Sequence, residues 1–308
     1  MVAQNIRLPN IRKIFIPDVG YVIVDSDLAG ADAQVVAWEA GDERLKQAFK
    51  SGAKIHILNA RDTWPERTAN LTDDELKATG DAGGMYYEIK RAVHGTNYGA
   101  SPGALVSALG WSEYKACEFQ ERWFYLHPEI REWHLRIERY LDGSQCWNCD
   151  NLEIKLGARG RCDNCEASLG RTVKNRFGFR RIFFDRVDGS LLPEALAWCP
   201  QSTVNFCVEL GWINIVYGHK YSMLLGHGEV HEFDWSQWLV CPDAGDKWRD
   251  LQQFLLQVHD SIVFQVKYRD ERYVENMVSD MRVIVPYSDP LIIPMSVAKS
   301  RISWGDCK

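Results

Sequence analysis

The chain has 308 residues, of which 46% are hydrophobic and 25% charged, and its formal net charge is −6 at pH 7. This composition is that of a globular protein, and the length allows two subdomains around a sizeable core. No apolar run approaches the ~20 residues needed to cross a bilayer, and the first residues lack the apolar centre of a signal peptide. We therefore expect a cytoplasmic protein without a membrane partner. The negative total disfavours a general nucleic-acid surface but is compatible with a local basic groove beside an acidic metal site.

The first predicted strand leads into acidic residues. Apolar residues from Tyr21 to Val24 predict the strand, and Asp25, Ser26 and Asp27 follow it directly. Carboxylates at a strand end are well placed to bind a cation.

Helical patterns occupy most of the chain from residue 31 to residue 141. An amphipathic helix is predicted over residues 31–49, with an interruption near Gly41-Asp42. Further helices are predicted over residues 53–64, after a capping box from Thr72 to Glu75, over residues 85–101, and over residues 111–141 with Pro128 near a helix start.

A stripe of four residues follows one face of the helix predicted over residues 85–101. Tyr86, Lys90, His94 and Tyr98 are four positions apart, so they align on this face. One interpretation is a half-buried face with a lysine that reaches solvent. The other is a nucleotide grip, in which the cation contacts phosphate and a ring contacts the base or sugar.

Four cysteines form a metal-binding pattern. Cys146, Cys149, Cys162 and Cys165 have the spacing C-x2-C-x12-C-x2-C, which predicts a zinc ribbon with one structural Zn²⁺. Two disulfides or a chance clustering of thiols are the alternatives, and a reducing cytosol disfavours the disulfides. The other cysteines are expected to be ordinary core or surface residues, namely Cys117, Cys199, Cys207, Cys241 and Cys307.

The second half of the chain contains two predicted hairpins. RTVKNRFGFRRIFFDR predicts a basic hairpin that turns at Gly178, and residues 191–225 predict a long helix that carries Gln201. In LLQVHDSIVFQV, apolar strands flank a turn formed by His259, Asp260 and Ser261. Asp260 either hydrogen-bonds its own turn or is held ready for a cation. The closing residues LIIPMSVAKSRISWGD predict a strand and a tail.

Three motifs in order resemble the polymerase core of family A DNA polymerases. Asp27 to Asp32, leading to the Gly-Asp-Glu at residues 41–43, resembles motif A. Lys90-x3-His94-Gly95-x2-Tyr98-Gly99 resembles motif B, and Gln257-Val-His-Asp260 resembles motif C. Shorter stretches also fall in the family's order: Gln4 to Ile6, Ile55-His56, Gln201 to Thr203, and Trp304 to Asp306. The likeness spans nearly the whole chain, and HGTNYG and VHDS are closest to phage members.

The resemblance implies DNA-templated addition of deoxynucleoside triphosphates to a primer 3′-end by two-metal-ion transfer. Asp27 and Asp260 would lie side by side in an antiparallel palm sheet and hold two Mg²⁺ ions. The backbone carbonyl of Ser26 or Leu28 could add a ligand.

The resemblance also implies contacts with nucleotide and primer–template DNA. Lys90 would bind the triphosphate and act as proton donor to pyrophosphate, and His56 would contact the triphosphate tail. His94 would pack against the incoming sugar and base, while Tyr98 would stack near the templating base. The implied DNA contacts are Gln201 in the minor groove, with Gln257 and His259 near the primer terminus.

Several positions depart from the family pattern. Tyr86 stands where most members have an arginine, so the grip on the γ-phosphate is altered. Asp32 replaces the glutamate that blocks a ribose 2′-hydroxyl, which predicts looser sugar discrimination. Ser261 replaces the glutamate after the motif C aspartate. Asp25 competes with Asp27 as the motif A ligand, but alignment back from the Gly-Asp-Glu favours Asp27.

The implied fold class is α+β, with an antiparallel palm sheet and helices, a helical fingers subdomain and an inserted zinc ribbon. The expected segments are residues 1–50 (palm, motif A), 51–140 (fingers, motif B), 141–170 (zinc ribbon) and 171–308 (palm, motif C). The ribbon could brace the basic hairpin, touch DNA or dock a partner.

Family members usually carry an exonuclease-like domain and a helical thumb before the palm, whereas this sequence starts close to Gln4. We therefore expect a second polypeptide that supplies the thumb, with or without the exonuclease, and docks near Gln4 to Ile16. The alternative to an active enzyme is a catalytically silent nucleic-acid-binding subunit or fragment of a split polymerase. The joint presence of Asp27, Asp260, Lys90, Tyr98 and Gln201 favours the enzyme, in the host cytoplasm if the chain is phage-encoded.

Overall fold

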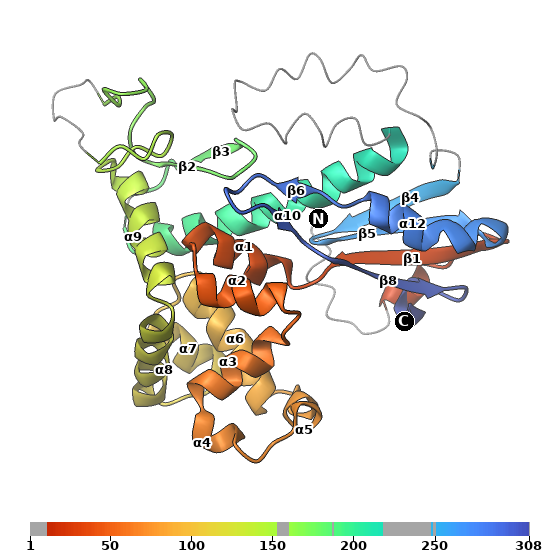
Figure 1. Ribbon diagram of the computed structural model, residues 1–308, viewed down its shortest axis with the longest axis horizontal. Coiled ribbons are helices and arrows are strands. Elements are labelled where there is room, and N and C mark those ends of the chain that lie inside the picture. Colours follow the sequence, from red (N-terminus) through yellow and green to blue (C-terminus); the bar gives the residue numbers. More distant parts are fainter. Residues whose placement is uncertain (1–10, 153–159, 187, 218–247, 249–250, 308) are drawn as a thin grey trace. The chain divides into compact units, whose positions relative to one another are not determined.

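The computed structural model describes residues 11–152, 160–186, 188–217, 248 and 251–307 (Figure 1). The chain forms two compact units, which we call the sheet unit (residues 1–31, 176–178 and 201–308) and the helical unit (residues 32–175 and 179–200). The predicted Gln4 to Ile6 stretch, Cys241 and the end of the long helix after residue 217 lie outside the described residues. The predicted division into palm, fingers and ribbon segments stays a prediction.

A four-stranded antiparallel sheet with the order β4-β5-β1-β8 forms the centre of the sheet unit. Its strands are β1 (Tyr21–Leu28), β4 (Gln252–Val258), β5 (Ser261–Lys267) and β8 (Met295–Ser300). Strand β1 pairs with β5 on one side and with β8 on the other, so its backbone is bonded through Asp25, Ser26 and Asp27. The strand predicted to end at Val24 therefore continues to Leu28, and the carboxylates lie within it.

The apolar faces of these strands account for the core of the sheet unit. Ile23, Val258, Val263 and Trp304 form one buried cluster, against which Leu256 and Cys307 pack. The other elements among the described residues of the unit are η2 (Ile11–Ile14), η4 (Tyr268–Tyr273), α12 (Val274–Asp280), β6 (Ile284–Val285), β7 (Leu291–Ile292) and η5 (Trp304–Asp306). Helix α10 (Leu191–Tyr217) begins in the helical unit, and its residues from Gln201 onward belong to the sheet unit.

The helical unit contains α1 (Ala31–Ala40), α2 (Glu43–Lys50), α3 (Ile55–Thr63), α4 (Pro65–Thr68), α5 (Asp73–Ala78), α6 (Met85–Asn97), α7 (Pro102–Leu109), α8 (Glu113–Leu126) and α9 (Pro128–Asp142). The predicted break at Gly41-Asp42 is confirmed. Gly41 has φ +78°, and the Asp42 side chain caps α2 by accepting from the Leu45 N–H at 2.9 Å. Within the described part of the chain, no helix is long and apolar enough to cross a membrane.

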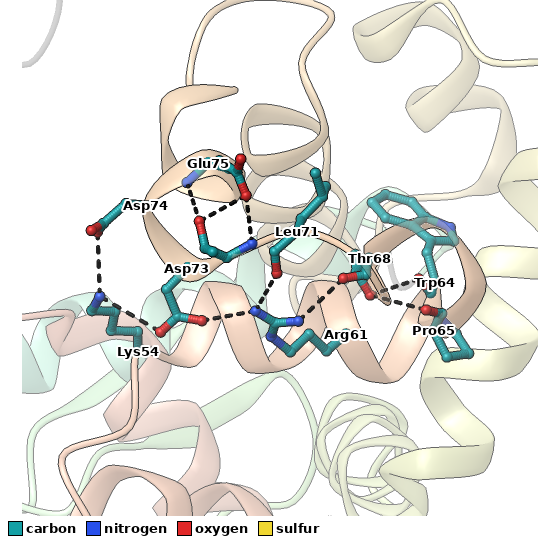
Figure 2. A network of polar contacts seen from close by, with 10 residues as sticks. Lys54, Arg61, Trp64, Pro65, Thr68, Leu71, Asp73, Asp74 and Glu75 are labelled. Carbon is teal, nitrogen blue, oxygen red and sulfur yellow. Dashed lines mark hydrogen bonds and ion pairs between the residues drawn. The ribbon is translucent and has the colours of Figure 1, made fainter.

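Arg61 closes the loop between α4 and α5 (Figure 2). Its guanidinium donates to the Thr68 carbonyl at 3.2 Å, to the Leu71 carbonyl at 2.9 Å and to the Asp73 carboxylate at 2.9 Å. The predicted capping box of Thr72 and Glu75 is present and begins α5. These bonds satisfy loop carbonyls that no helix would otherwise pair, and they attach α5 to α3.

The predicted basic hairpin is also confirmed. Its strands are β2 (Thr172–Lys174) and β3 (Arg180–Ile182), and Gly178 at the turn has φ +88°. A positive φ is accessible to glycine without a steric penalty, which explains the residue at this turn.

Close packing at Gly211 gives a test of the sheet unit. A Cβ at this position of α10 would lie 2.5 Å from the Met281 carbonyl oxygen. Gly211→Ala should therefore lower the free energy of unfolding by about 1–3 kcal/mol through overpacking, measured by urea denaturation. Gly103→Ala in α7 is the matched control, because a Cβ there meets nothing closer than 3.8 Å and alanine favours the helix. Equal stability of the Gly211→Ala variant and the parent would contradict this packing.

Candidate active site

The strand register places two carboxylates next to each other in the sheet unit. Asp27 lies opposite Ser261 in the pairing of β1 with β5, and Asp260 immediately precedes Ser261 in the turn after β4. The Leu28 N–H donates to the Asp260 carbonyl oxygen at 3.0 Å, which ties the turn to the end of β1. The predicted adjacency of Asp27 and Asp260 is confirmed, and their role as metal ligands stays a prediction.

Neighbouring charges perturb Asp27. Burial, followed by the negative charges of Asp260 and Asp25, raises the pKa of Asp27 to about 7. The side chains of Asp27 and Asp260 also share a hydrogen bond, which requires a proton on one of them. Near neutral pH this pair therefore binds a proton that a cation would displace.

A hydrogen bond from Trp304 distinguishes Asp25 from Asp27. Alternation along β1 puts both aspartates on one face, but the Trp304 indole N–H donates to Asp25 Oδ2 at 2.7 Å. The ring is itself held by Arg12, which lies 4.4 Å above it, and by Phe15 at 5.7 Å between centroids. The sequence analysis included Trp304 among the short stretches that occur in the same order as in family A polymerases, but it assigned Trp304 no role.

The turn between β4 and β5 is strained at its first residue. His259 has φ +54°, a left-handed conformation that is uncommon outside glycine, and its Nδ1 lies 3.6 Å from Asp260 Oδ1. The turn contains two residues, because Ser261, which was predicted to belong to it, is already the first residue of β5. Strain of this kind is often concentrated at functional sites.

Polar residues of α10 lie beside the strand that leads to this turn. Gln257 donates to Asn205 Oδ1 at 2.9 Å, and Asn205 donates to Glu209 Oε1 at 2.7 Å. Gln201 is exposed one helical turn before Asn205, so these two face the same way. The sequence analysis missed Asn205, whose spacing of four residues from Gln201 is the signal that identifies it.

In the helical unit, α6 presents the predicted stripe with a histidine of α3 beside it. The rings of His94 and Tyr98 pack edge to face at 4.5 Å, and those of His56 and Tyr86 do so at 5.8 Å. Burial, and then the charges of Lys90 and His94, lowers the pKa of His56 to about 4. His56 is therefore neutral at pH 7. Its buried Nδ1 has no hydrogen-bond partner among the described residues.

Tyr98 lies beside the carboxylate of Asp32 in the helical unit. Burial raises the pKa of Tyr98 above its usual range, and the neighbouring Asp32 carboxylate raises it further. Tyr98 therefore keeps its hydroxyl proton, and the Asp32 side chain lies close to it.

Buried contacts fix α6 at both ends. Lys115 binds Glu88 at 2.8 Å and lies 4.1 Å above the Trp111 ring. At the far end, Trp123 donates to Asn97 Oδ1 at 2.9 Å. These contacts come from α8 and the loop before it, so they hold the helix that carries Lys90.

The four paired cysteines converge on one point. Their Sγ atoms all lie within 4.8 Å of one another, and the Cys146–Cys165 and Cys149–Cys162 separations are 3.6 Å. That is close to the edge of ~3.8 Å expected for a tetrahedron with ~2.3 Å Zn–S bonds. These cysteines are free thiols, so the predicted disulfide alternative is not what the structure contains.

Each pair of cysteines sits in the same kind of turn. In each, the residue after the second cysteine is left-handed, at φ +59° for both Asp150 and Glu166. Its N–H donates to the carbonyl of the first cysteine at 2.9 Å in both turns. Burial opposes ionisation of Cys162, but N–H donors from Asn164 and Cys165 lower its pKa to about 7. The donor set and geometry fit a tetrahedral thiolate site for a zinc ion.

The structure thus gathers the predicted residues into three groups. Asp27, Asp260, Gln201, Gln257 and His259 belong to the sheet unit. The predicted nucleotide-binding residues belong to the helical unit, as do the paired cysteines: Asp32, His56, Lys90, His94, Tyr98, Cys146, Cys149, Cys162 and Cys165.

Comparisons with known proteins agree on one family. Residues 3–146 match the sequence model of DNA polymerase family A. DNA polymerase I of Caldicellulosiruptor bescii is 29% identical over 300 residues, which covers 97% of this chain and 28% of that protein. The thermostable DNA polymerase I of Thermus filiformis is 32% identical over 144 residues, or 45% of this chain and 16% of that protein. The chain thus spans less than a third of the length of these relatives.

A solved structure shares the fold. It is the POL domain of Pol1 from M. smegmatis in complex with DNA primer-template and dNTP, with a TM-score of 0.65 and 19% sequence identity. The match covers 97% of this chain and 43% of that one. The mixed architecture of an antiparallel sheet and helices is therefore that of a polymerase domain.

The repulsion between the two carboxylates predicts that removing one charge increases thermal stability by an amount that depends on pH. Because the folded pKa of Asp27 is raised from 3.8 to about 7, its protonated form stabilises the fold, and this contribution is lost as pH rises through 7. Without divalent cations, Asp260→Asn should raise the melting temperature at pH 8.5 by about 2–4 °C, and by less at pH 5. The exposed Asp74→Asn is the control and should show no such difference. A gain that is equal at both pH values would contradict the repulsion.

Proposed function

We propose, from its membership of DNA polymerase family A, that the chain extends a primer 3′-end on a DNA template with deoxynucleoside triphosphates. The observation that carries this proposal is the Asp27–Asp260 pair, in which the pKa of Asp27 is raised to about 7. Two carboxylates held together at the cost of repulsion are typical of a site whose charge is balanced by cations.

The sheet unit supplies the reacting groups of the proposed mechanism. Asp27 and Asp260 would hold two Mg²⁺ ions, which when bound would activate the primer hydroxyl and neutralise charge at the leaving pyrophosphate. The backbone carbonyl of Ser26 or Leu28 is a further ligand in this proposal. The protein's contribution is to keep the two carboxylates in register through β1, β5 and the turn between them. Trp304 would act as a positioning residue, since its indole N–H donates to Asp25 Oδ2 and holds that side chain.

The helical unit would bind the incoming nucleotide. Lys90 would contact the triphosphate and give a proton to the leaving pyrophosphate. His56 would contact the triphosphate tail through its neutral ring, whose buried Nδ1 has no partner in the described part of the chain. His94 would pack against the sugar and base.

Tyr98 and Asp32 would shape the pocket on its other side. Tyr98 would stack near the templating base, with its hydroxyl kept protonated beside Asp32. Asp32 is one methylene shorter than the usual glutamate, so we propose weaker exclusion of ribonucleotides. Tyr86, in the place of an arginine, would offer a hydroxyl but no charge to the phosphates.

The DNA would be held by polar residues near the carboxylate pair. Gln201 would reach the minor groove, and Gln257 and His259 would lie near the primer terminus. Asn205 orients Gln257 through the hydrogen bond of 2.9 Å, so we add it as a positioning residue. A cytoplasmic location, a phage origin and a separate thumb-bearing polypeptide stay predictions from the sequence.

Primer extension tests this function directly. With Mg²⁺ and four deoxynucleotides, the parent chain should extend a primer, while Asp27→Ala and Asp260→Ala should lose extension by at least about 1,000-fold, because charge stabilisation of the transition state is removed. Affinity for primer–template should change by no more than a few fold, since phosphate contacts dominate it. The control Asp74→Ala should extend as the parent does.

Extension by either aspartate variant at near the parental rate would reject the assignment of the catalytic pair. Binding of primer–template by the parent without any extension would instead support the silent nucleic-acid-binding subunit.

A further inference from the structure

The chain enters and leaves the cysteine-rich segment at neighbouring backbone positions. We call residues 144–169 the ribbon. At its base, the Arg171 N–H donates to the Leu141 carbonyl at 2.8 Å. Gly143 and Gly170, at φ +85° and +78°, lie against each other so closely that a Cβ on Gly143 would be 3.3 Å from the Gly170 nitrogen. The fold before and after the ribbon is thus joined without it.

A side chain of the β2–β3 hairpin binds the ribbon next to the metal ligands, in addition to the bonds that Arg139 and Tyr140 of α9 make to Gln145 and Asp150. Lys174 of strand β2 donates to the Asn148 carbonyl oxygen at 3.2 Å and to Asn148 Oδ1 at 2.8 Å. The same ammonium lies 5.7 Å above the ring of Trp147. Trp147 and Asn148 are the two residues between Cys146 and Cys149, so Lys174 grips the first cysteine turn itself.

Asn148 is also bonded to thiols of both cysteine pairs. Its N–H donates to Cys146 Sγ at 3.4 Å, and its side-chain amide to Cys165 Sγ at 3.6 Å. Trp147 in turn donates to the Ser168 carbonyl, beyond the second pair, at 2.7 Å. The turn that Lys174 contacts is therefore bonded to the second cysteine turn as well. In a segment this small, a metal ion is what brings them together.

The hairpin that carries Lys174 needs outside support. Its strands are only three residues each, and a two-stranded hairpin is marginally stable in water. Lys174 also lies directly opposite Arg180, and like charges in that position are destabilising. Ile182 lies two residues after Arg180, on the same side of β3, and is exposed. Phe184, beyond the end of the strand, is 87% accessible.

We propose that the metal-loaded ribbon braces the β2–β3 hairpin through the contact of Asn148 with Lys174, so that metal occupancy sets the order of this basic hairpin. This goes beyond the proposed catalytic function, which assigns the ribbon no role. Of the roles open to the ribbon, bracing is the one that the observed contacts support, because the first cysteine turn is bonded to the hairpin.

Hydrogen exchange of the full chain tests the brace. The purified protein should contain about one equivalent of Zn²⁺ per chain. Removing it with a chelator should speed exchange about tenfold in peptides covering β2 and β3, including the Phe183 amide that donates to the Arg171 carbonyl at 2.8 Å. Peptides of the ribbon should also exchange faster, which verifies that the metal has left, and those of β1 and β5 should not.

Variants separate the brace from general destabilisation. Lys174→Met removes the ammonium but keeps an unbranched apolar side chain. The β2 and β3 amides of this variant should therefore exchange fast with or without metal. Asn148→Ala removes Oδ1, the closer of the two acceptors on the ribbon side, and leaves the Asn148 carbonyl. Its hairpin should therefore exchange faster than the parent's with metal bound, though less so than in Lys174→Met, while the β1 and β5 peptides stay protected. The exposed Lys77→Met in α5 is the matched control and should behave as the parent does.

Two outcomes would overturn the proposal. One is equal amide exchange of the parental hairpin with and without metal, although metal removal speeds exchange in the ribbon. The other is a hairpin in both Lys174→Met and Asn148→Ala that still responds to metal as the parent's does. Neither readout depends on primer extension, so failure of the brace and failure of the polymerase function are distinguishable.

Discussion

The repulsion between Asp27 and Asp260 is the constraint on which the site depends. The residues are more than 200 positions apart in the chain, and only the antiparallel register of β1 and β5 brings them together. The fold tolerates this contact because the backbone around it is fully paired: β1 is bonded on both sides, and Leu28 binds the Asp260 carbonyl. Moving the two backbones apart would break strand pairs, so the two carboxylates stay close together and the pKa of Asp27 stays raised.

The residues around Asp27 and Asp260 fix the positions of the neighbouring carboxylate and of the turn. Trp304, the first residue of η5, donates its indole N–H to Asp25 Oδ2 and so holds the third carboxylate of this face in place. The charge of Asp25 still contributes to the raised pKa of Asp27. The left-handed His259 sets the direction of the turn that presents Asp260. In the helical unit, burial shifts a pKa in the opposite direction. It lowers the pKa of His56 and so keeps that ring neutral next to Lys90.

Much of this arrangement could be predicted from local sequence. The break at Gly41-Asp42, the capping box at Thr72, the α6 stripe and the hairpin turning at Gly178 all rest on interactions within a few residues. The cysteine spacing likewise predicted a cluster that the Sγ distances bear out. What the sequence could not reveal are partners distant in the chain: the indole of Trp304 on Asp25, Asn205 on Gln257, and Lys174 on Asn148. The end of β1 was misplaced for the same reason, because pairing with β5 and β8 overrides the poor strand propensity of aspartate.

The most direct test of the central claim is the proton balance of Mg²⁺ binding. If Asp27 has a pKa of about 7 in the free protein, binding of Mg²⁺ at pH 7 should release about half a proton per chain, and almost none at pH 9. Calorimetric titration in two buffers of different ionisation enthalpy measures this number, and Asp27→Asn should abolish it. Binding of Mg²⁺ at pH 7 with no proton released would contradict the account, because it would mean that the carboxylates are already fully ionised and do not constrain each other.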